Sequence, residues 1–318
     1  METMDGSILK NTMTYPSSNE EYTIHAISWQ PRIDSDVKAV LQIAHGMAEY
    51  ADRYDDFARF MVGKGFAVYA NDHIGHGYSV NSEGDYGYFG KSMGRTHLVN
   101  DMYKLSLIAK DRWLDKPLFL LGHSMGSYLS RRYTALYGND LSGAVYMGTG
   151  NGNPFIGIAV LLAKLMSDIR GDKAPGKLLD RLAFGDFNKH ISSPQTNFDW
   201  LSTNQNNVEQ YINDKLNGFV FTNSAFVELF SVIREVTKKK WATQLPQNLP
   251  ILLISGKEDP VGNYGKGVEK TMDLLESAGM TNVTLKLYDG MRHEILNEKN
   301  NSLVYQYIFE WLEKCIER

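Results

Sequence analysis

The sequence predicts an α/β fold in which a mostly parallel sheet is covered by helices on both faces and carries an inserted helical unit. Apolar runs of strand length alternate with helical stripes along most of the chain. At 318 residues, the chain is long enough to bury a substantial core. The alternation stops between about residues 149 and 250. We therefore expect a core formed by residues 1–148 and 250–318, and a helical cap insertion spanning residues 149–249.

Seven apolar runs have the length expected of strands that are buried within a sheet. In chain order they are Tyr22–Trp29, Val37–Ala44, Ala67–Ala70, Leu118–Leu121, Gly143–Met147, Ile251–Ser255 and Val283–Tyr288. The apolar spacing around Phe57 and around Val268 predicts amphipathic helices between strands. A third stripe, Ile308–Cys315, predicts a last helix with the thiol of Cys315 buried and inert.

The insertion contains four apolar or amphipathic segments: Phe155–Leu162, Lys177–Phe184, Val208–Leu216 and Phe226–Val236. Because the strands resume afterwards, we expect these segments over the carboxyl ends of the sheet, where open α/β folds bind ligands. The stretch from Pro154 to Met166 is too short to cross a bilayer. It is either a helix buried within the insertion or a partly exposed helix that lines an acyl tunnel or contacts a membrane or micelle.

The composition narrows the class of partner. The formal net charge is −4, with acidic and basic residues interspersed, which disfavours nucleic acid and favours a small-molecule substrate. The single cysteine cannot form an internal disulfide, as is typical of a reducing compartment. The first residues lack the pattern of a secretory signal, so we expect a cytoplasmic location. No motif calls for a cofactor, and the oligomeric state stays open.

A serine nucleophile is indicated by Gly122–Gly126 (GHSMG), which follows the predicted strand Leu118–Leu121 and precedes a helical stretch. A chain that reverses from strand to helix within a few residues strains its central residue and requires small neighbours. A second match, Gly90–Gly94 (GKSMG), follows a loop-like stretch. This context selects Ser124 and makes Ser92 a serine of a surface loop or helix cap.

Two later loops supply the partners that a serine nucleophile needs. The strand Ile251–Ser255 is followed by a loop with Glu258 and Asp259, and the strand Val283–Tyr288 by a loop with His293. Asp259 is preferred over Glu258 because the following proline restricts its backbone. The amides of Met47 and Met125 are the expected donors of an oxyanion hole.

We expect the other histidines to have structural and not catalytic roles. His73 and His76 lie near Asp72, but a third ligand cluster is missing, so we expect a turn and no metal site. We expect His45 to brace the loop that carries Met47. The remaining histidines, which we expect on the surface or on helix faces, are His25, His97 and His190.

Four motifs together resemble the monoacylglycerol lipase and lysophospholipase branch of the α/β-hydrolase family. They are His45–Glu49 (HGMAE), Asn71–Gly77 (NDHIGHG), Gly122–Gly126 (GHSMG) and His293–Glu298 (HEILNE). The likeness runs from about residue 22 to the C-terminus, and it implies an α/β-hydrolase fold.

The resemblance also assigns roles to individual residues. It implies a triad of Ser124, Asp259 and His293 with an oxyanion hole from Met47 and Met125. It further implies that Glu49, Arg53 and His123 place the glycerol end of the substrate. The alternative for Glu49 and Arg53 is an ion pair between residues four apart on a helix.

We therefore expect a serine carboxylester hydrolase that acts on monoacylglycerol or similar single-chain lipid esters through an acyl-enzyme. One alternative is an aminopeptidase or amidase with the same triad. It would need a carboxylate under the insertion to hold a substrate ammonium group, and Asp199 and Glu228 are candidates. A second alternative is a noncatalytic receptor on this fold, although no triad position is lost.

Overall fold

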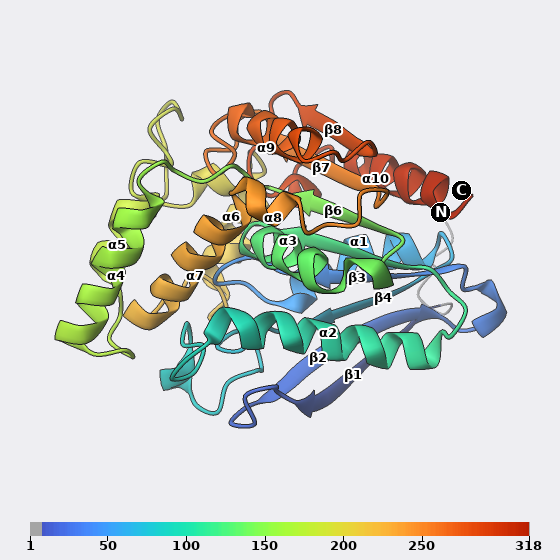
Figure 1. Cartoon of the computed structure of the whole chain (residues 1–318), viewed down its shortest axis with the longest axis horizontal. Coiled ribbons are helices and arrows are strands. Elements are labelled where there is room, and N and C mark those ends of the chain that lie inside the picture. The colour runs from blue at the N-terminus through green and yellow to red at the C-terminus, as the bar shows by residue number, and fades with distance from the viewer. Residues whose placement is uncertain (1–7, 318) are drawn as a thin grey trace.

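The computed structural model of the protein describes residues 8–317, which form one eight-stranded sheet with helices on both faces (Figure 1). The strand order is β1-β2-β4-β3-β5-β6-β7-β8, and only the pairings β1–β2 and β2–β4 are antiparallel. The strands are β1 (Ile8–Pro16), β2 (Thr23–Pro31), β3 (Ala39–Ala44), β4 (Phe66–Asn71), β5 (Leu118–His123), β6 (Gly143–Met147), β7 (Ile251–Gly256) and β8 (Val283–Tyr288). The predicted α/β class and mostly parallel sheet are confirmed.

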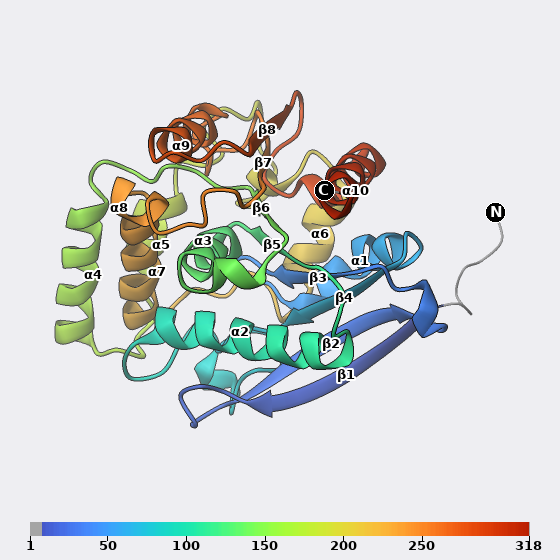
Figure 2. The same ribbon diagram turned by 45° about the vertical axis from the view of Figure 1, so that its right-hand side comes forward.

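Each central strand is apolar on both faces because helices cover both sides of the sheet. In β3, Leu41 and Ile43 join an apolar cluster with α1 (Asp55–Val62) and α10 (Asn301–Ile316). Val40 joins a second cluster with α2 (Gly94–Arg112), α3 (Met125–Tyr137) and α9 (Lys266–Ser277). Figure 2 shows α1 and α10 on one side of the sheet and α2 and α3 on the other.

Some elements differ from the sequence prediction. Strand β1 was missed because it is an edge strand whose side chains are mostly exposed, so it contains no apolar run. The predicted last helix is present as α10, but Cys315 is half-buried on it instead of fully buried. His25 lies in β2 with Nδ1 2.9 Å from Oδ2 of Asp72, and not on an exposed surface or a helix. Ser92 lies in an exposed loop, as predicted.

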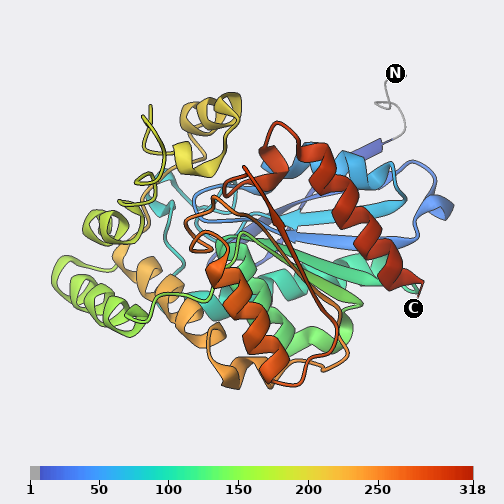
Figure 3. The same cartoon turned by 90° about the horizontal axis from the view of Figure 1, so that it is seen from above.

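Between β6 and β7 the described chain consists of helices and loops, and one isolated bridge, Pro175–Thr222, is its only strand pairing. The helices are α4 (Ile156–Arg170), α5 (Lys177–Phe184), α6 (Gln205–Asn213), α7 (Asn223–Val236) and α8 (Lys239–Ala242). Helix α7 packs against α4 and α3. In Figure 3, α4 and α5 lie at the left, beyond the end of the sheet. We keep the name insertion for residues 149–249.

Helix α4 is partly exposed, as in the second of the two interpretations of this stretch. Val160 and Ala163 are buried, whereas Leu161 is 67% and Ile169 70% exposed. No helix in the described residues 8–317 is long and apolar enough to cross a membrane.

Candidate active site

Ser124 lies at the junction between β5 and α3, in a strained backbone conformation with φ 52° and ψ −119°. The two motif glycines permit this tight turn. A Cβ atom on Gly122 would lie 2.3 Å from the carbonyl oxygen of Gly126, and one on Gly126 would lie 2.1 Å from that of Ala44. Side chains at either position would therefore push α3 away from the sheet. The turn leaves the side chain of Ser124 only half-buried.

Asp259 and His293 meet beyond the carboxyl ends of β7 and β8. Oδ2 of Asp259 lies 3.0 Å from Nδ1 of His293, and both side chains are almost fully buried. The carboxylate also accepts hydrogen bonds from the Ser255 hydroxyl and the Val261 amide. An ionised carboxylate at Nδ1 favours the tautomer with its proton there and leaves Nε2 free to accept a proton. Glu258, the alternative carboxylate, is 54% exposed.

His293 lies beside the turn that carries Ser124. A Cβ atom on Gly148 would lie 3.0 Å from Cε1 of His293 and 3.1 Å from Cδ2 of His123. The rings of His123 and His293 are 4.7 Å apart, and the Ser124 amide donates to the carbonyl of Met147, the residue before Gly148. The structure therefore brings Ser124, Asp259 and His293 to one edge of the sheet.

Of the two predicted oxyanion donors, Met125 directly follows Ser124 and Met47 lies on a loop that approaches it. Met125 is the first residue of α3, so its amide has no carbonyl partner within the helix and lies at the positive end of the helix dipole. Met47 lies on the loop after β3. That loop passes close to the nucleophile, because a Cβ atom on Gly46 would lie 3.1 Å from Cβ of Ser124.

The loop that carries Met47 is held by His45 and Glu49. Nδ1 of His45 lies 2.8 Å from its acceptor, the Gly46 carbonyl, and Nε2 accepts from the His73 amide. Burial and the neighbouring histidines lower the pKa of His45 well below its usual value, so the ring is neutral. The Glu49 carboxylate accepts from the Gly46 amide at 2.6 Å. His45 braces this loop, as predicted.

Glu49, Arg53 and His123 belong to one buried polar network. Glu49 lies 3.0 Å from Nδ1 of His123 and accepts from Arg53 at 2.7 Å. Burial opposes its ionisation, but the bonds from His123 and Arg53 outweigh this effect and hold the pKa of Glu49 far below its usual range. Conversely, Glu49 raises the pKa of His123 despite burial. The predicted ion pair between residues 49 and 53 is therefore present, but Glu49 lies in the loop before the short 3₁₀ helix Ala51–Tyr54 that carries Arg53.

The sequence did not predict the second partner of Arg53. Both terminal nitrogens of its guanidinium donate to the carboxylate of Glu294, at 2.7 and 2.8 Å. Glu294 directly follows His293 in the HEILNE motif, and this position was the available signal for a role of Glu294 in the site. Nothing in the sequence indicated that its partner would be Arg53. Trp200, from the insertion, was also missed, and its ring lies 5.1 Å from that of His293.

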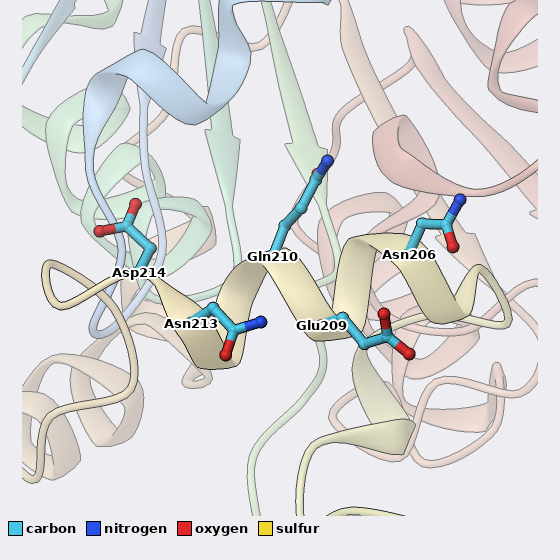
Figure 4. Close-up of a pocket in the computed structure, with 5 residues that line it drawn as sticks. All are labelled: Asn206, Glu209, Gln210, Asn213 and Asp214. Atoms are coloured by element: carbon cyan, nitrogen blue, oxygen red, sulfur yellow. The ribbon is translucent and has the colours of Figure 1, made fainter.

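A separate hollow of ≈590 Å³ runs along α6 (Figure 4). Its lining is polar and consists of Asn206, Glu209, Gln210, Asn213 and Asp214. None of the predicted site residues lines this hollow. We therefore do not assign the substrate to it.

A serine in a strained strand-to-helix turn, with a buried Asp–His pair at the same edge of this sheet, defines an α/β-hydrolase. The chain belongs to the family described as serine aminopeptidase, S33, whose model matches residues 35–300. It is 28% identical over 300 residues to the monoglyceride lipase of Mus musculus, covering 91% of this chain and 86% of the mouse protein.

Two further relatives agree with this assignment. The monoacylglycerol lipase of Mycolicibacterium smegmatis is 27% identical over 290 residues, covering 89% of this chain and 90% of that protein. The crystal structure of a thermostable carboxyl esterase from Bacillus coagulans, in complex with glycerol, superposes with a TM-score of 0.90 at 29% identity. That superposition covers 96% of this chain and 99% of the esterase. The protein is thus an enzyme of the α/β-hydrolase class, similar to lipases and esterases.

Proposed function

We propose that this protein hydrolyses monoacylglycerols or similar single-chain lipid esters through an acyl-enzyme. The observation that carries the proposal is the buried pair of His293 and Asp259 beside the strained turn of Ser124. Such an arrangement makes an ordinary hydroxyl reactive because the imidazole accepts its proton while the carboxylate holds the imidazole in position.

The reaction has two steps that balance in protons. In the first, Oγ of Ser124 attacks the ester carbonyl carbon and Nε2 of His293 takes the hydroxyl proton. The amides of Met47 and Met125 stabilise the oxyanion, and the departing alcohol takes the proton back from His293. In the second step, water gives a proton to His293 and attacks the acyl carbonyl carbon. The bond from that carbon to Oγ of Ser124 then breaks, His293 returns the proton to Oγ, and the fatty acid leaves.

The substrate class rests on the relatives and on the insertion. The mouse and mycolicibacterial relatives are named as lipases of monoglycerides, and the Bacillus coagulans esterase was solved with glycerol. We place the acyl chain under the insertion. We assign Glu49, Arg53 and His123 to the glycerol end. The polar atoms of these three residues bond one another. They therefore act on the glycerol end by holding the loop of Met47 in place, through the bond from the Gly46 amide to Glu49.

We also propose that the exposed face of α4 makes transient contact with a membrane or micelle. Its exposed apolar side chains recur every three or four residues and so share one side of the helix. They are Ile158, Leu161, Leu165 and Ile169, and the exposed Phe155 directly precedes the helix. Replacing Leu161 and Ile169 by serine is expected to weaken sedimentation with lipid vesicles and to leave hydrolysis of a short soluble ester unchanged. Unchanged sedimentation would contradict this contact.

A substrate panel tests the main proposal. Monoacylglycerols of increasing chain length are compared with an acetyl ester, and a Ser124→Ala variant is the control. Medium and long chains are expected to give the higher kcat/KM, and Ser124→Ala is expected to abolish both turnover and labelling by a fluorophosphonate. A preference for acetyl esters would contradict the lipid substrate, and activity of Ser124→Ala would contradict the mechanism.

Aminoacyl amides are the second candidate substrates, because the family is described as serine aminopeptidase. This activity needs a carboxylate to hold the substrate ammonium group. The two candidates already have donors, since Asp199 accepts from the Gln195 amide and Glu228 accepts from Arg95. These bonds favour the ester. Faster hydrolysis of aminoacyl p-nitroanilides than of monoacylglycerols would reverse this preference.

A further inference from the structure

His293 lies on a segment that the sheet supports weakly. It follows β8, which is an edge strand that pairs only with β7 and whose residues are all half-buried. A catalytic imidazole needs a fixed orientation, because a displacement of about 1 Å costs about 100-fold in rate. Some other part of the chain must therefore hold the histidine loop, defined here as residues 292–298.

Residues 199–207 of the insertion, named here the brace segment, bind the histidine loop on the side before His293. Nη1 of Arg292 donates to the carbonyl oxygens of Asp199 and Ser202, at 2.7 and 3.1 Å. On the other side of the imidazole, the amide of Glu294 donates to the Leu201 carbonyl at 2.7 Å. The two residues that flank His293 are thus both bonded to the brace segment.

The brace segment also holds the end of the histidine loop through the buried carboxylate of Glu298. This carboxylate accepts from the amide of Thr203, at 3.0 and 3.1 Å, and from its hydroxyl. It also accepts from the Arg292 amide at 2.9 Å, which closes the loop upon itself. A single buried carboxylate therefore ties both ends of the histidine loop to the insertion.

Asn207, on α6, makes a further connection between the brace segment and the histidine loop. Its Nδ2 donates to Glu294 at 2.7 Å, and its Oδ1 accepts from Arg53 at 3.2 Å. Since Arg53 also donates to Glu49, which holds the loop of Met47, the bonds of Asn207 connect the histidine loop with the loop of Met47.

We propose that the brace segment is a positioning element for His293. Its positioning residues are Thr203 and Asn207, and their partner in the histidine loop, Glu298, is a third. The inference rests on the proposed function, because it concerns how the same catalytic centre is held. It assigns to part of the insertion a role in the rate of the reaction, separate from covering the substrate. None of the three positioning residues has to touch the substrate.

The experiment compares two substitutions with matched controls in the full-length protein. Thr203→Val removes the hydroxyl donor to Glu298 while keeping the shape of the side chain, and Thr203→Ser restores the hydroxyl. Asn207→Ala removes the bonds to Glu294 and Arg53. Its control is Asn206→Ala, the same change at the neighbouring exposed residue of α6, which lines the hollow in Figure 4.

The readouts are kcat and KM for a medium-chain ester and the low-field proton resonance of Nδ1 of His293. The double variant of Thr203→Val with Asn207→Ala is expected to lower kcat by about 10- to 100-fold. KM is expected to stay within about twofold of the unmodified protein, and the Nδ1 resonance to shift or broaden. Thr203→Ser and Asn206→Ala are expected to keep the original kcat and resonance. Should the double variant not fold, Thr203→Val against Thr203→Ser makes the same comparison.

Two failures can be told apart. If Ser124→Ala remains active, the proposed function is wrong and the positioning role falls with it. If Ser124→Ala is inactive but the folded double variant keeps its kcat and its Nδ1 resonance, the positioning role alone is wrong. A loss of kcat that merely matches the fraction unfolded would overturn it as well.

Discussion

Replacing Ser124 by glycine is expected to stabilise the protein relative to replacing it by alanine, opposite to the usual effect of glycine. At φ 52° and ψ −119°, a residue with a side chain costs about 1–3 kcal/mol of backbone strain. Alanine keeps this strain and glycine removes it. Glycine loses about 0.5–1 kcal/mol through the greater freedom of the unfolded chain. The Ser124→Gly variant should therefore exceed Ser124→Ala in free energy of unfolding by about 1 kcal/mol.

Urea denaturation and thermal melting measure this difference, which corresponds to about 2 °C in Tm for a chain of this size. The Ser124 side chain makes no capping hydrogen bond to α3, so neither replacement removes one. The two variants therefore differ from each other only in backbone freedom and in one methyl group. Both variants should be inactive.

Ser130, which is buried within α3, provides the control for this comparison. At that position glycine should be less stable than alanine by about 1 kcal/mol, because the backbone is helical. The reasoning would be refuted if Ser124→Gly were less stable than Ser124→Ala by a similar amount.

Three further predictions concern the site and its surroundings. Gly46→Ala should lower kcat at least about 100-fold, because its Cβ atom would lie 2.6 Å from Oε1 of Glu49 and displace the loop of the proposed oxyanion donor Met47; ester kinetics near the original kcat would contradict the proposed role of that loop. Asp259→Asn should lower kcat about 10⁴-fold with little change in KM, since the imidazole loses its orienting carboxylate; a change confined to KM would count against the triad. Burial lowers the pKa of His73 to about 4, below its unfolded value near 6.5, so the unfolded chain binds a proton first as the pH falls. The free energy of unfolding should therefore fall by about 2 kcal/mol through this residue between pH 7 and pH 5. Urea denaturation should show a shallower pH dependence in His73→Gln, and an unchanged slope would be evidence against the buried neutral ring.

Elements with a clear apolar run or apolar stripe were predictable from the sequence, because this periodicity is visible in the residues alone. Strands β6 and β8 have the predicted bounds, and α5 coincides with the predicted segment 177–184. Strand β1 and helix α2 were not predicted. The side chains of β1 are mostly exposed, and those of α2 lack a clear apolar stripe, so neither shows a periodic signal.

The same contrast holds for the candidate site. Ser124, Asp259 and His293 each follow a strand, and the carboxyl ends of parallel strands meet at one edge, so their convergence could be inferred from order alone. The pairing of Arg53 with Glu294 joins residues 241 positions apart. It depends on how two loops and α6 pack together, which no local pattern encodes. The bonds of the brace segment were unpredictable for the same reason.

The way the insertion is attached determines how such enzymes can be recombined. A chimera that takes the whole of residues 149–249 from a relative would also exchange Thr203 and Asn207, whose partners Glu298 and Glu294 remain in the recipient. A graft limited to α4 and α5 leaves those bonds untouched. Engineers who seek a new chain-length preference should therefore exchange the outer pair of helices and keep the recipient's own residues from 199 onwards.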